Sequence, residues 1–185
     1  ANNIKGSRDL KISIVRYGNV MGSRGSVIPF FLEKVKEGEL PITDPAMTRF
    51  NISLEESIKM VIWALENLIG GELFVPKLSS YNILDVAEAI GPSCKKPIIG
   101  IRSGEKIHEE MITSSDSYST IELDKYYAIL PPDGQLLDKY KQRNIKFKNF
   151  PKNVSYNSGT NQDFLTIEQI RSLIRAHINK NFVPV

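Results

Sequence analysis

Short apolar runs that alternate with helical patterns constrain the fold of this chain more than any other feature of its sequence. The run KISIV is followed by a helical pattern over residues 26–38, ELFVP by one over 81–90, and KPIIGI by one over 104–112. Strands that alternate with helices are typical of α/β folds. KISIV is also apolar on both faces, as a central parallel strand should be. We therefore predict an α/β protein, with three or four strands visible, which is few for a complete doubly wound sheet.

The strongest helical pattern covers residues 53–68, SLEESIKMVIWALENL. Ser53 and Glu56 have the spacing of a capping box, which predicts where this helix begins. Apolar residues then recur at helical spacing and form the apolar stripe of an amphipathic helix. The stripe consists of Ile58, Val61, Ile62 and Leu65.

The domain prediction separates residues 1–132, an α/β region, from residues 133–185, an irregular tail. The polar part of this tail, 133–163, is the predicted mobile or wrapping segment. Thr166 and Gln169 form a second capping box, so the tail is predicted to end in a helix that packs on the same domain.

Composition argues against several classes of function. The net charge is only +3 over 185 residues, which gives no broad field for nucleic acid or a membrane. No apolar run approaches the roughly 20 residues that span a bilayer. Cys94 is the only cysteine and the two histidines lie far apart, so we predict no disulfide and no metal site. These features favour a cytoplasmic protein. Because the chain lacks an initiating methionine, we interpret it as a processed chain or a fragment.

The segment RYGNVMGSRGS, residues 16–26, places three glycines within eight residues, directly after an apolar run. Glycine lets a backbone approach a ligand or turn where a side chain would clash. One interpretation is a strand–turn–helix junction. The other is a backbone cradle for a phosphate or cofactor, with Asn19 and Arg24 as polar contacts. The spacing is not G-x-G-x-x-G, so it is not a dinucleotide fingerprint.

A second polar segment, GIRSGEKIHEEM, spans residues 100–111. Arg102 is predicted at the end of a strand, and Glu105 at the beginning of a helix that Gly104 opens. The segment is either an exposed charged cap or an anion site, in which an arginine fork and a helix N-terminus meet one phosphate group.

Two further segments have alternative interpretations. PITDPAMTRF, residues 41–50, is either a bare loop or an extended segment whose backbone amides pair with a flat polar ring. The basic segment 139–152 carries Tyr140, Phe147 and Phe150. Aromatic side chains among basic ones can bind single-stranded nucleic acid, or these rings can dock on their own domain.

Taken together and in this order, four stretches resemble a known family: RYGNVMGSRGSVIPFF, LPITDPAMTRFNISLEES, GGELFVPKLSS and IIGIRSGEKIHEEM. They resemble the C-terminal half of the inverting UDP-N-acetylglucosamine 4,6-dehydratases, which open bacterial pseudaminic acid biosynthesis. These enzymes belong to the polysaccharide-biosynthesis branch of the extended short-chain dehydrogenases/reductases. The resemblance runs from about Ala1 to Pro131. It implies the end of a Rossmann-type parallel sheet together with the smaller substrate-binding region.

The resemblance also implies a role for each matching residue. The residues implied to line the nicotinamide cofactor, usually NADP, are Val20, Met21, Gly22, Ser23 and Arg24. The residues implied to bind UDP-N-acetylglucosamine are Asn19 at the sugar, Thr43, Met47 and Arg49 at uridine, and Arg102 and Glu105 at the diphosphate and ribose. The family usually has proline in R-P-G-E-K, and Ser103 stands there in this chain, which leaves the turn less pre-set.

The catalytic residues of that family have no match in this sequence. The reaction needs a tyrosine made basic by a nearby lysine, in a Y-x-x-x-K motif, and none of the seven tyrosines has a lysine four residues on. The glycine-rich cofactor motif is absent as well. We therefore predict a substrate-binding portion that is inactive alone, and that forms a homo-oligomer or associates with the missing N-terminal part.

Other functions remain open on the sequence. The chain also suits part of a related nucleotide-sugar epimerase or reductase, which shares the fold and differs in upstream residues. A second alternative is a non-catalytic fragment that holds a nucleotide sugar. A nucleic-acid binder that uses residues 139–152 is a third, and the small net charge argues against it.

Overall fold

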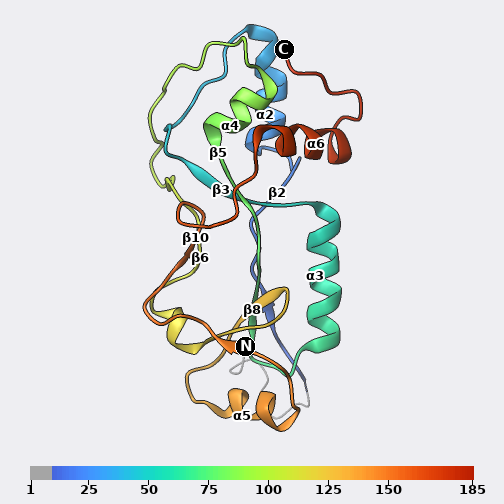
Figure 1. Ribbon diagram of the computed structural model, residues 1–185, viewed down its shortest axis with the longest axis vertical. Coiled ribbons are helices and arrows are strands. Elements are labelled where there is room, and N and C mark those ends of the chain that lie inside the picture. Colours follow the sequence, from blue (N-terminus) through green and yellow to red (C-terminus); the bar gives the residue numbers. More distant parts are fainter. Residues whose placement is uncertain (1–9) are drawn as a thin grey trace. The chain divides into compact units, whose positions relative to one another are not determined.

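The computed structural model describes residues 10–185, and these form two compact units (Figure 1). Unit 1 consists of residues 10–17, Glu55–Lys77 and Glu110–Tyr156. Unit 2 consists of Gly18–Leu54, Leu78–Glu109 and Asn157–Val185. The predicted tail after residue 132 therefore contributes to both units.

Unit 1 contains a five-stranded sheet. In spatial order its strands are β1 (Ile14–Val15), β4 (Leu73–Pro76), β8 (Tyr126–Ile129), β7 (Thr120–Glu122) and β9 (Lys148–Asn149). The first pair is parallel, with Ile14 opposite Leu73, and the other pairs are antiparallel. The predicted strand in KISIV thus forms, but within the described residues it stands at the end of this sheet, and Ile14 is half exposed.

The helices of unit 1 are α3 (Leu54–Asn67, whose first residue belongs to unit 2), α5 (Gln135–Gln142) and the short 3₁₀ helix η2 (Asp116–Ser119). α3 packs Met60 and Ala64 against Phe74 of the sheet. The Trp63 ring lies edge-on to the Phe74 ring, with 5.2 Å between the ring centroids. Burial of these apolar groups is the main contribution to the stability of this unit.

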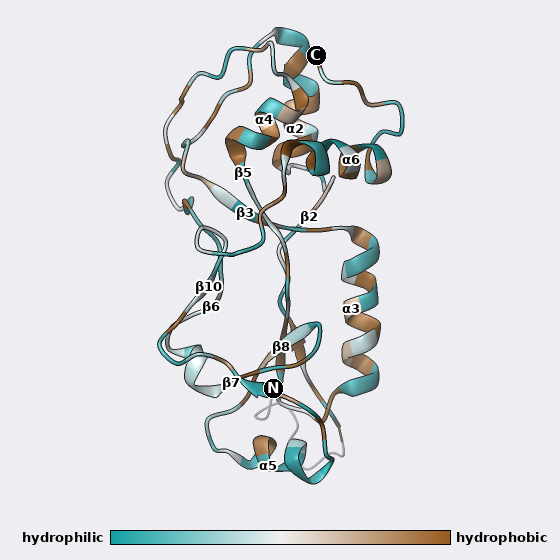
Figure 2. Cartoon of the chain, in the orientation of Figure 1, coloured by the Kyte–Doolittle hydropathy of each residue, from teal (hydrophilic) through white to brown (hydrophobic). Residues whose placement is uncertain are grey.

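The apolar stripe of α3 does not face the core of unit 1. Its four members, Ile58, Val61, Ile62 and Leu65, are 46–73% exposed. The side that packs on the sheet is instead the one carrying Ser57, Met60 and Ala64, which are buried. The helix therefore has two apolar sides, and the stronger one in the sequence is not the one that the described chain covers. Figure 2 shows hydrophobic residues in brown recurring along this helix.

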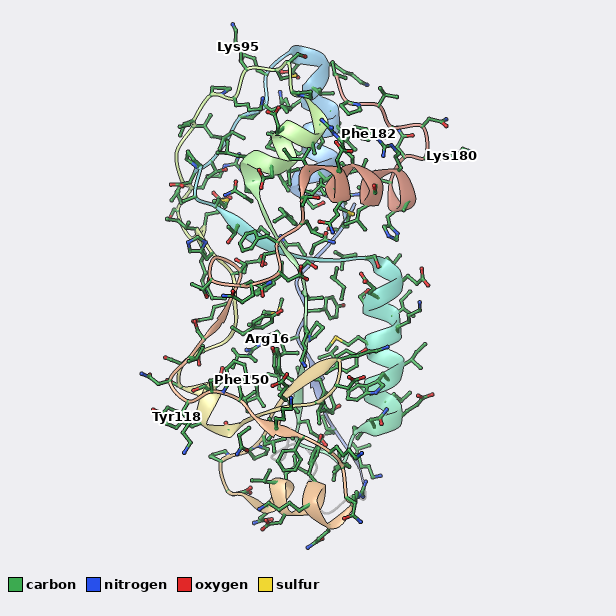
Figure 3. The ribbon with its side chains drawn as sticks, in the orientation of Figure 1. Arg16, Lys95, Tyr118, Phe150, Lys180 and Phe182 are labelled. Atoms are coloured by element: carbon green, nitrogen blue, oxygen red, sulfur yellow. The ribbon has the colours of Figure 1, made fainter. Side chains whose placement is uncertain are left out.

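The region after Pro132 is more regular than predicted, because α5 forms there. Its Leu136 and Tyr140 are buried in the core of unit 1, whereas the rest of the helix is polar. Tyr140 meets Phe147 edge-on, and Phe150, labelled in Figure 3, packs edge-on against Tyr127. The aromatic residues of the basic segment thus dock on their own unit, which removes the stacking surface that a nucleic-acid site would need.

Unit 2 is built from a small sheet and three main helices. The strands are β2 (Asn19–Val20), β3 (Thr48–Ile52) and β5 (Ser80–Asn82), in that order. The helices are α2 (Val27–Lys34), which continues into the 3₁₀ helix η1 (Val35–Glu37), α4 (Ile83–Ile90) and α6 (Ile167–His177). β2 runs parallel to β3, and β5 runs antiparallel to it.

Side-chain caps mark the beginning of two helices of unit 2, α4 and α6, whereas Ser26 before α2 makes no side-chain cap hydrogen bond. Asn82 caps α4 by accepting from the Leu84 N–H at 2.7 Å. The predicted capping box of α6 is confirmed: Thr166 N–H donates to the Gln169 side chain at 2.8 Å, and Gln169 N–H donates to the Thr166 hydroxyl at 3.3 Å. Such caps satisfy helix N–H groups that have no partner within the helix. They fix where α4 and α6 begin, and these helices pack together in the core with α2 (Figure 1).

Two predicted elements near residue 100 do not form. The predicted strand KPIIGI makes only one isolated parallel bridge, in which Ile42 N–H donates to the Pro97 carbonyl and Ile99 N–H to the Ile42 carbonyl. The predicted helix over 104–112 is replaced by a turn and by β6 (Glu110–Ile112). Gly100 and Gly104 both have positive φ, which breaks a regular element on each side of Arg102. The remaining strand, β10 (Tyr156–Asn157), lies where the chain passes between the units.

Among residues 10–185, no helix combines the length and apolarity needed to cross a bilayer. In the same residues, no group of three or more histidine, cysteine or acidic side chains is arranged to hold a metal ion.

Candidate functional site: a polar cavity in unit 2

A cavity of about 430 Å³ opens in unit 2. Seven of the eleven predicted site residues line it, although they come from three separate stretches of sequence. These are Asn19, Arg24, Thr43, Met47, Arg49, Arg102 and Glu105. The fold thus brings together the residues to which the sequence analysis assigned nucleotide-sugar contacts.

The loop before β3 is held in place by Asp44. Its carboxylate accepts from the Ala46 N–H at 2.7 Å, and its carbonyl accepts from the Met47 N–H at 3.1 Å. The Met47 carbonyl in turn accepts from the Ile83 N–H at the beginning of α4. This turn delivers Met47 and Arg49 to the cavity from a rigid strand end.

The Arg49 side chain is almost enclosed, with only 12% of it exposed. Its Nη1 donates to the Thr48 carbonyl at 2.7 Å and to the Ile107 carbonyl at 3.0 Å. Its Nε lies 3.7 Å from the Glu109 carboxylate. An arginine held at two of its nitrogens can still offer the N–H groups of the third to a ligand.

Arg102 and Glu105 are the two ends of a turn that two hydrogen bonds between them close. Glu105 N–H donates to the Arg102 carbonyl at 3.0 Å, and Arg102 N–H donates to the Glu105 carboxylate at 3.2 Å. Gly104 supplies the positive φ of this turn. Both side chains line the cavity, so the predicted pair is adjacent there, but it is presented by a turn and not by a helix N-terminus.

The residues predicted to line the cofactor are divided. Arg24 lines the cavity, whereas Val20, Met21, Gly22 and Ser23 do not figure among its lining residues. The Met21 side chain is buried in the core, so a ligand would meet its backbone. Gly22 has positive φ, and a Cβ there would lie 3.1 Å from the Ile178 side chain. Exposed Ser23 and Arg24 lead from this turn into α2.

Burial shapes the electrostatics behind Arg49. Burial raises the pKa of Glu109 above its ordinary value, against the opposing effects of the Phe50 N–H and the Arg49 guanidinium. Burial, helped by the Glu109 charge, also raises the pKa of Tyr81, which stands opposite Arg49 in the β3–β5 pair. The phenol therefore stays neutral, and Arg49 is the cation of this group.

Sequence reasoning missed one wall of the cavity, which α2 supplies. Phe30, Phe31 and Glu33 line it, together with Ile83 and Ile99 from other stretches. The signal was present in the pair Phe30–Phe31, because two adjacent helix residues cannot both face one core. Phe31 is buried, and Phe30 is partly exposed.

The family model described as "Polysaccharide biosynthesis protein" matches residues 1–131, so the chain belongs to this family of polysaccharide biosynthesis proteins. Two relatives from Campylobacter jejuni strains are both UDP-N-acetylglucosamine 4,6-dehydratases (inverting). One is 54% identical over 133 residues, covering 71% of this chain and 40% of the relative. The other is 44% identical over 181 residues, covering 94% and 54%. A UDP-glucose 4-epimerase of Rickettsia canadensis is 43% identical over 135 residues, covering 70% and 39%.

A solved structure of Pen from Bacillus thuringiensis has the same fold, with a TM-score of 0.78 and 31% identity. The match covers 94% of this chain and 52% of that one. The chain thus spans about half the length, or less, of these relatives. The predicted resemblance and the α/β class are confirmed, and the roles of individual site residues stay predictions.

Proposed function

We propose that the chain is the substrate-binding portion of a UDP-N-acetylglucosamine 4,6-dehydratase that inverts C5, acting in bacterial surface-sugar or flagellin-glycan biosynthesis. The observation that carries this proposal is the cavity of unit 2, in which seven predicted contacts gather from three stretches of sequence. The dehydratase relatives from Campylobacter jejuni support the choice of reaction. Pseudaminic acid as the end product and the cytoplasm as the location belong to the same proposal.

The chemistry of the lining suits a uridine diphosphate sugar. Arg24, Arg49 and Arg102 exceed the two lining carboxylates, Glu33 and Glu105, so the cavity carries one net positive charge. That charge suits a diphosphate, for which arginine is the best-shaped donor. Glu105 accepts from the ribose hydroxyls, while Thr43 and Met47 border the uracil and Asn19 contacts the sugar. The apolar ring of Phe30 completes the cavity wall that α2 supplies.

A nicotinamide cofactor, with NADP preferred to NAD, would meet the chain at residues 20–24. The exposed turn at Gly22 and the free position of Arg24 fit the approach of an anionic ligand to the backbone. When bound, the cofactor supplies the hydride acceptor and donor of the reaction. The chain itself contributes binding and orientation there, and we assign it no catalytic residue.

The first competing function is part of an epimerase, which the Rickettsia relatives favour. Both enzymes bind UDP-sugars, so binding alone does not separate them. A second is a nucleotide-sugar-binding fragment without chemistry, which the absent Y-x-x-x-K motif favours. Incubation with UDP-N-acetylglucosamine and NADP separates these cases when this chain is compared with a form extended to the relatives' length. We expect a 4-keto product from the extended form alone. Turnover by this chain contradicts the fragment interpretation, and a 4-epimer from the extended form contradicts dehydration.

Unit 1 suggests how such a portion is completed. One side of β1 and the second apolar side of α3 are left uncovered by the described residues. An open strand edge and an exposed apolar helix face invite pairing. We propose that the N-terminal part of the relatives' length covers them, with homo-oligomer formation as the alternative. Light scattering on this chain alone should then detect self-association, and a stable monomer at high concentration contradicts the proposal.

Calorimetric titration of UDP tests the binding site directly. Hydrogen bonds to charged groups contribute roughly 1.5–3 kcal/mol, so Arg102→Ala should weaken UDP binding by about tenfold to a hundredfold. Arg102→Lys should recover only part, because a point charge does not reproduce the guanidinium fork. Glu105→Gln should weaken binding less than Glu105→Ala. Arg143→Ala, which removes an exposed arginine of unit 1, is the charge-matched control and should change nothing. Equal affinity for Arg102→Ala and the parent removes this site.

A further inference from the structure

The Arg49 guanidinium is oriented by groups that lie behind the cavity. The Thr48 and Ile107 carbonyls hold its Nη1, and Glu109 faces its Nε. Neither Ile107 nor Glu109 is among the residues that line the cavity. The direction in which Arg49 points is therefore set by the Thr48 carbonyl and by the segment 107–109, which lies outside the lining of the cavity.

That segment is itself anchored by a residue from the far end of the chain. Ser158 is fully buried, and its hydroxyl accepts from the Glu109 N–H at 2.9 Å. The same hydroxyl donates to the Thr48 carbonyl at 3.2 Å and lies 2.8 Å from the Thr48 hydroxyl. One buried serine thus ties Glu109 to β3, the strand that carries Arg49.

His108 provides the second attachment. Its Nδ1 lies 2.8 Å from the Thr48 hydroxyl, and Gly159 packs so closely on the ring that a Cβ would lie 2.5 Å from Nδ1. The Thr48 N–H also donates to the Ile107 carbonyl at 3.0 Å. The three consecutive residues 107–109 are therefore each fixed, either to β3 or to the Ser158–Gly159 turn.

We propose that Glu109 is a positioning residue for the nucleotide site: held by Ser158 and His108, it fixes the Arg49 guanidinium so that its remaining N–H groups face the cavity. The inference rests on the proposed function and deepens it, because it names what orients one of the arginines that recognise UDP. It also gives the segment at 157–159 a role in binding, through the Ser158 hydroxyl. The Glu109 carboxylate is suited to this role, since it also accepts from the Phe50 N–H at 3.2 Å and so cannot swing freely.

A double-mutant cycle for UDP affinity, measured by calorimetry on this chain, tests the proposal. Glu109→Gln keeps the size and an acceptor for Phe50 but removes the charge at Arg49. It should weaken UDP binding roughly five- to thirtyfold. Arg49→Ala should weaken it by about tenfold or more, and adding Glu109→Gln to Arg49→Ala should change affinity by less than about twofold, because the group it positions is gone. Glu109→Asp, which keeps the charge, should recover part of the loss.

The matched control is Glu110→Gln, the exposed neighbour, which removes the same charge without the Arg49 contact and should leave affinity unchanged. An equal loss from Glu109→Gln in both backgrounds overturns the inference, because Glu109 would then act independently of Arg49. Equal losses from Glu109→Gln and Glu110→Gln overturn it too, since net charge alone would be responsible. If the parent chain does not bind UDP, the proposed function fails first, and that result is distinct from both.

Discussion

The contact between Gly159 and His108 makes a single added methyl group costly at a position outside the cavity. A Cβ built on Gly159 would lie 2.5 Å from His108 Nδ1 and 2.7 Å from two ring carbons. Real Cβ atoms do not approach other atoms so closely. Gly159 is not among the residues with positive φ, so Gly159→Ala strains the packing and not the backbone. The ring has to move, and its hydrogen bond to Thr48 is then lost.

The cost can be estimated from these two effects. Overpacking of a well-packed site costs about 1–3 kcal/mol, and the lost hydrogen bond costs about 0.5–1.5 kcal/mol. The free energy of unfolding should therefore fall by about 2–4 kcal/mol. For a chain of this size, each kcal/mol lowers the melting temperature by about 2–4 °C, which gives a decrease of roughly 5–15 °C. UDP affinity should fall as well, because His108 holds the segment that orients Arg49.

Thermal and urea unfolding of four proteins provides the assay: the parent, Gly159→Ala, His108→Ala and the double variant. In the His108→Ala background there is no ring to displace, so Gly159→Ala should cost less than about 0.5 kcal/mol. A small gain is equally consistent, since alanine restricts the unfolded chain. The reasoning is refuted if Gly159→Ala costs the same in both backgrounds, because the clash with His108 would then not be its cause.

Two further predictions concern carboxylates, one buried and one half-buried. Glu72 is almost fully buried in unit 1 and accepts from the Ile69 and Gly70 N–H groups at 2.7 and 2.8 Å. Glu72→Gln should lower the free energy of unfolding by about 2–3 kcal/mol, because one N–H group loses its acceptor. An unchanged midpoint of urea unfolding contradicts this. Burial raises the pKa of Glu109, so the stability linked to its protonation is present below the unfolded-state pKa and lost as pH rises through the folded-state pKa. Glu109→Gln should therefore be at least as stable as the parent at about pH 8 and lose that advantage near pH 4; an equal loss at both pH values would disprove it.

The sequence predicted the elements whose signals are local. α4 and α6 begin where Asn82 and Thr166 can cap them, and each carries an apolar stripe that packs in unit 2. Capping depends on residues only two or three positions apart, so it can be read without knowledge of the fold. The end of α3 before Gly70 and Gly71 and the strand β4 after them follow from the same kind of signal.

Local patterns are insufficient where distant residues decide. The exposed stripe of α3 is as apolar as a core face, and only the position of the sheet selects Met60 and Ala64 instead. The expected helix after Gly104 does not form, because its residues make hydrogen bonds with distant segments: Glu109 N–H donates to Ser158, 49 residues away. α5 was missed because only Leu136 and Tyr140 of its eight residues are buried. Tertiary contacts override local propensity in each case.

For the site, resemblance to a family identified which residues to examine, and geometry shows which of them are adjacent. Arg49 and Arg102 are 53 positions apart in sequence, yet both line one cavity. What no local pattern could reveal is the support behind Arg49, because Glu109, His108 and Ser158 do not contact that cavity. Their roles depend on hydrogen bonds that join residues 48–50, 107–109 and 158, and such long-range bonds have no signature in the sequence of any one segment.

The two units differ in the features that they present: unit 2 has a cavity, and unit 1 has uncovered apolar surface. This difference bears on the proposed function. Unit 2 has a formed cavity with an oriented arginine and capped helices, which are the features that binding needs. Within residues 10–185, unit 1 leaves one side of β1 and one apolar side of α3 uncovered, which are the features that association needs. Under the proposed function, the determinants of binding would lie in unit 2 and those of association in unit 1. A substrate-binding portion that depends on another polypeptide segment for its catalytic residues requires both, and an isolated binding module would have no use for the second.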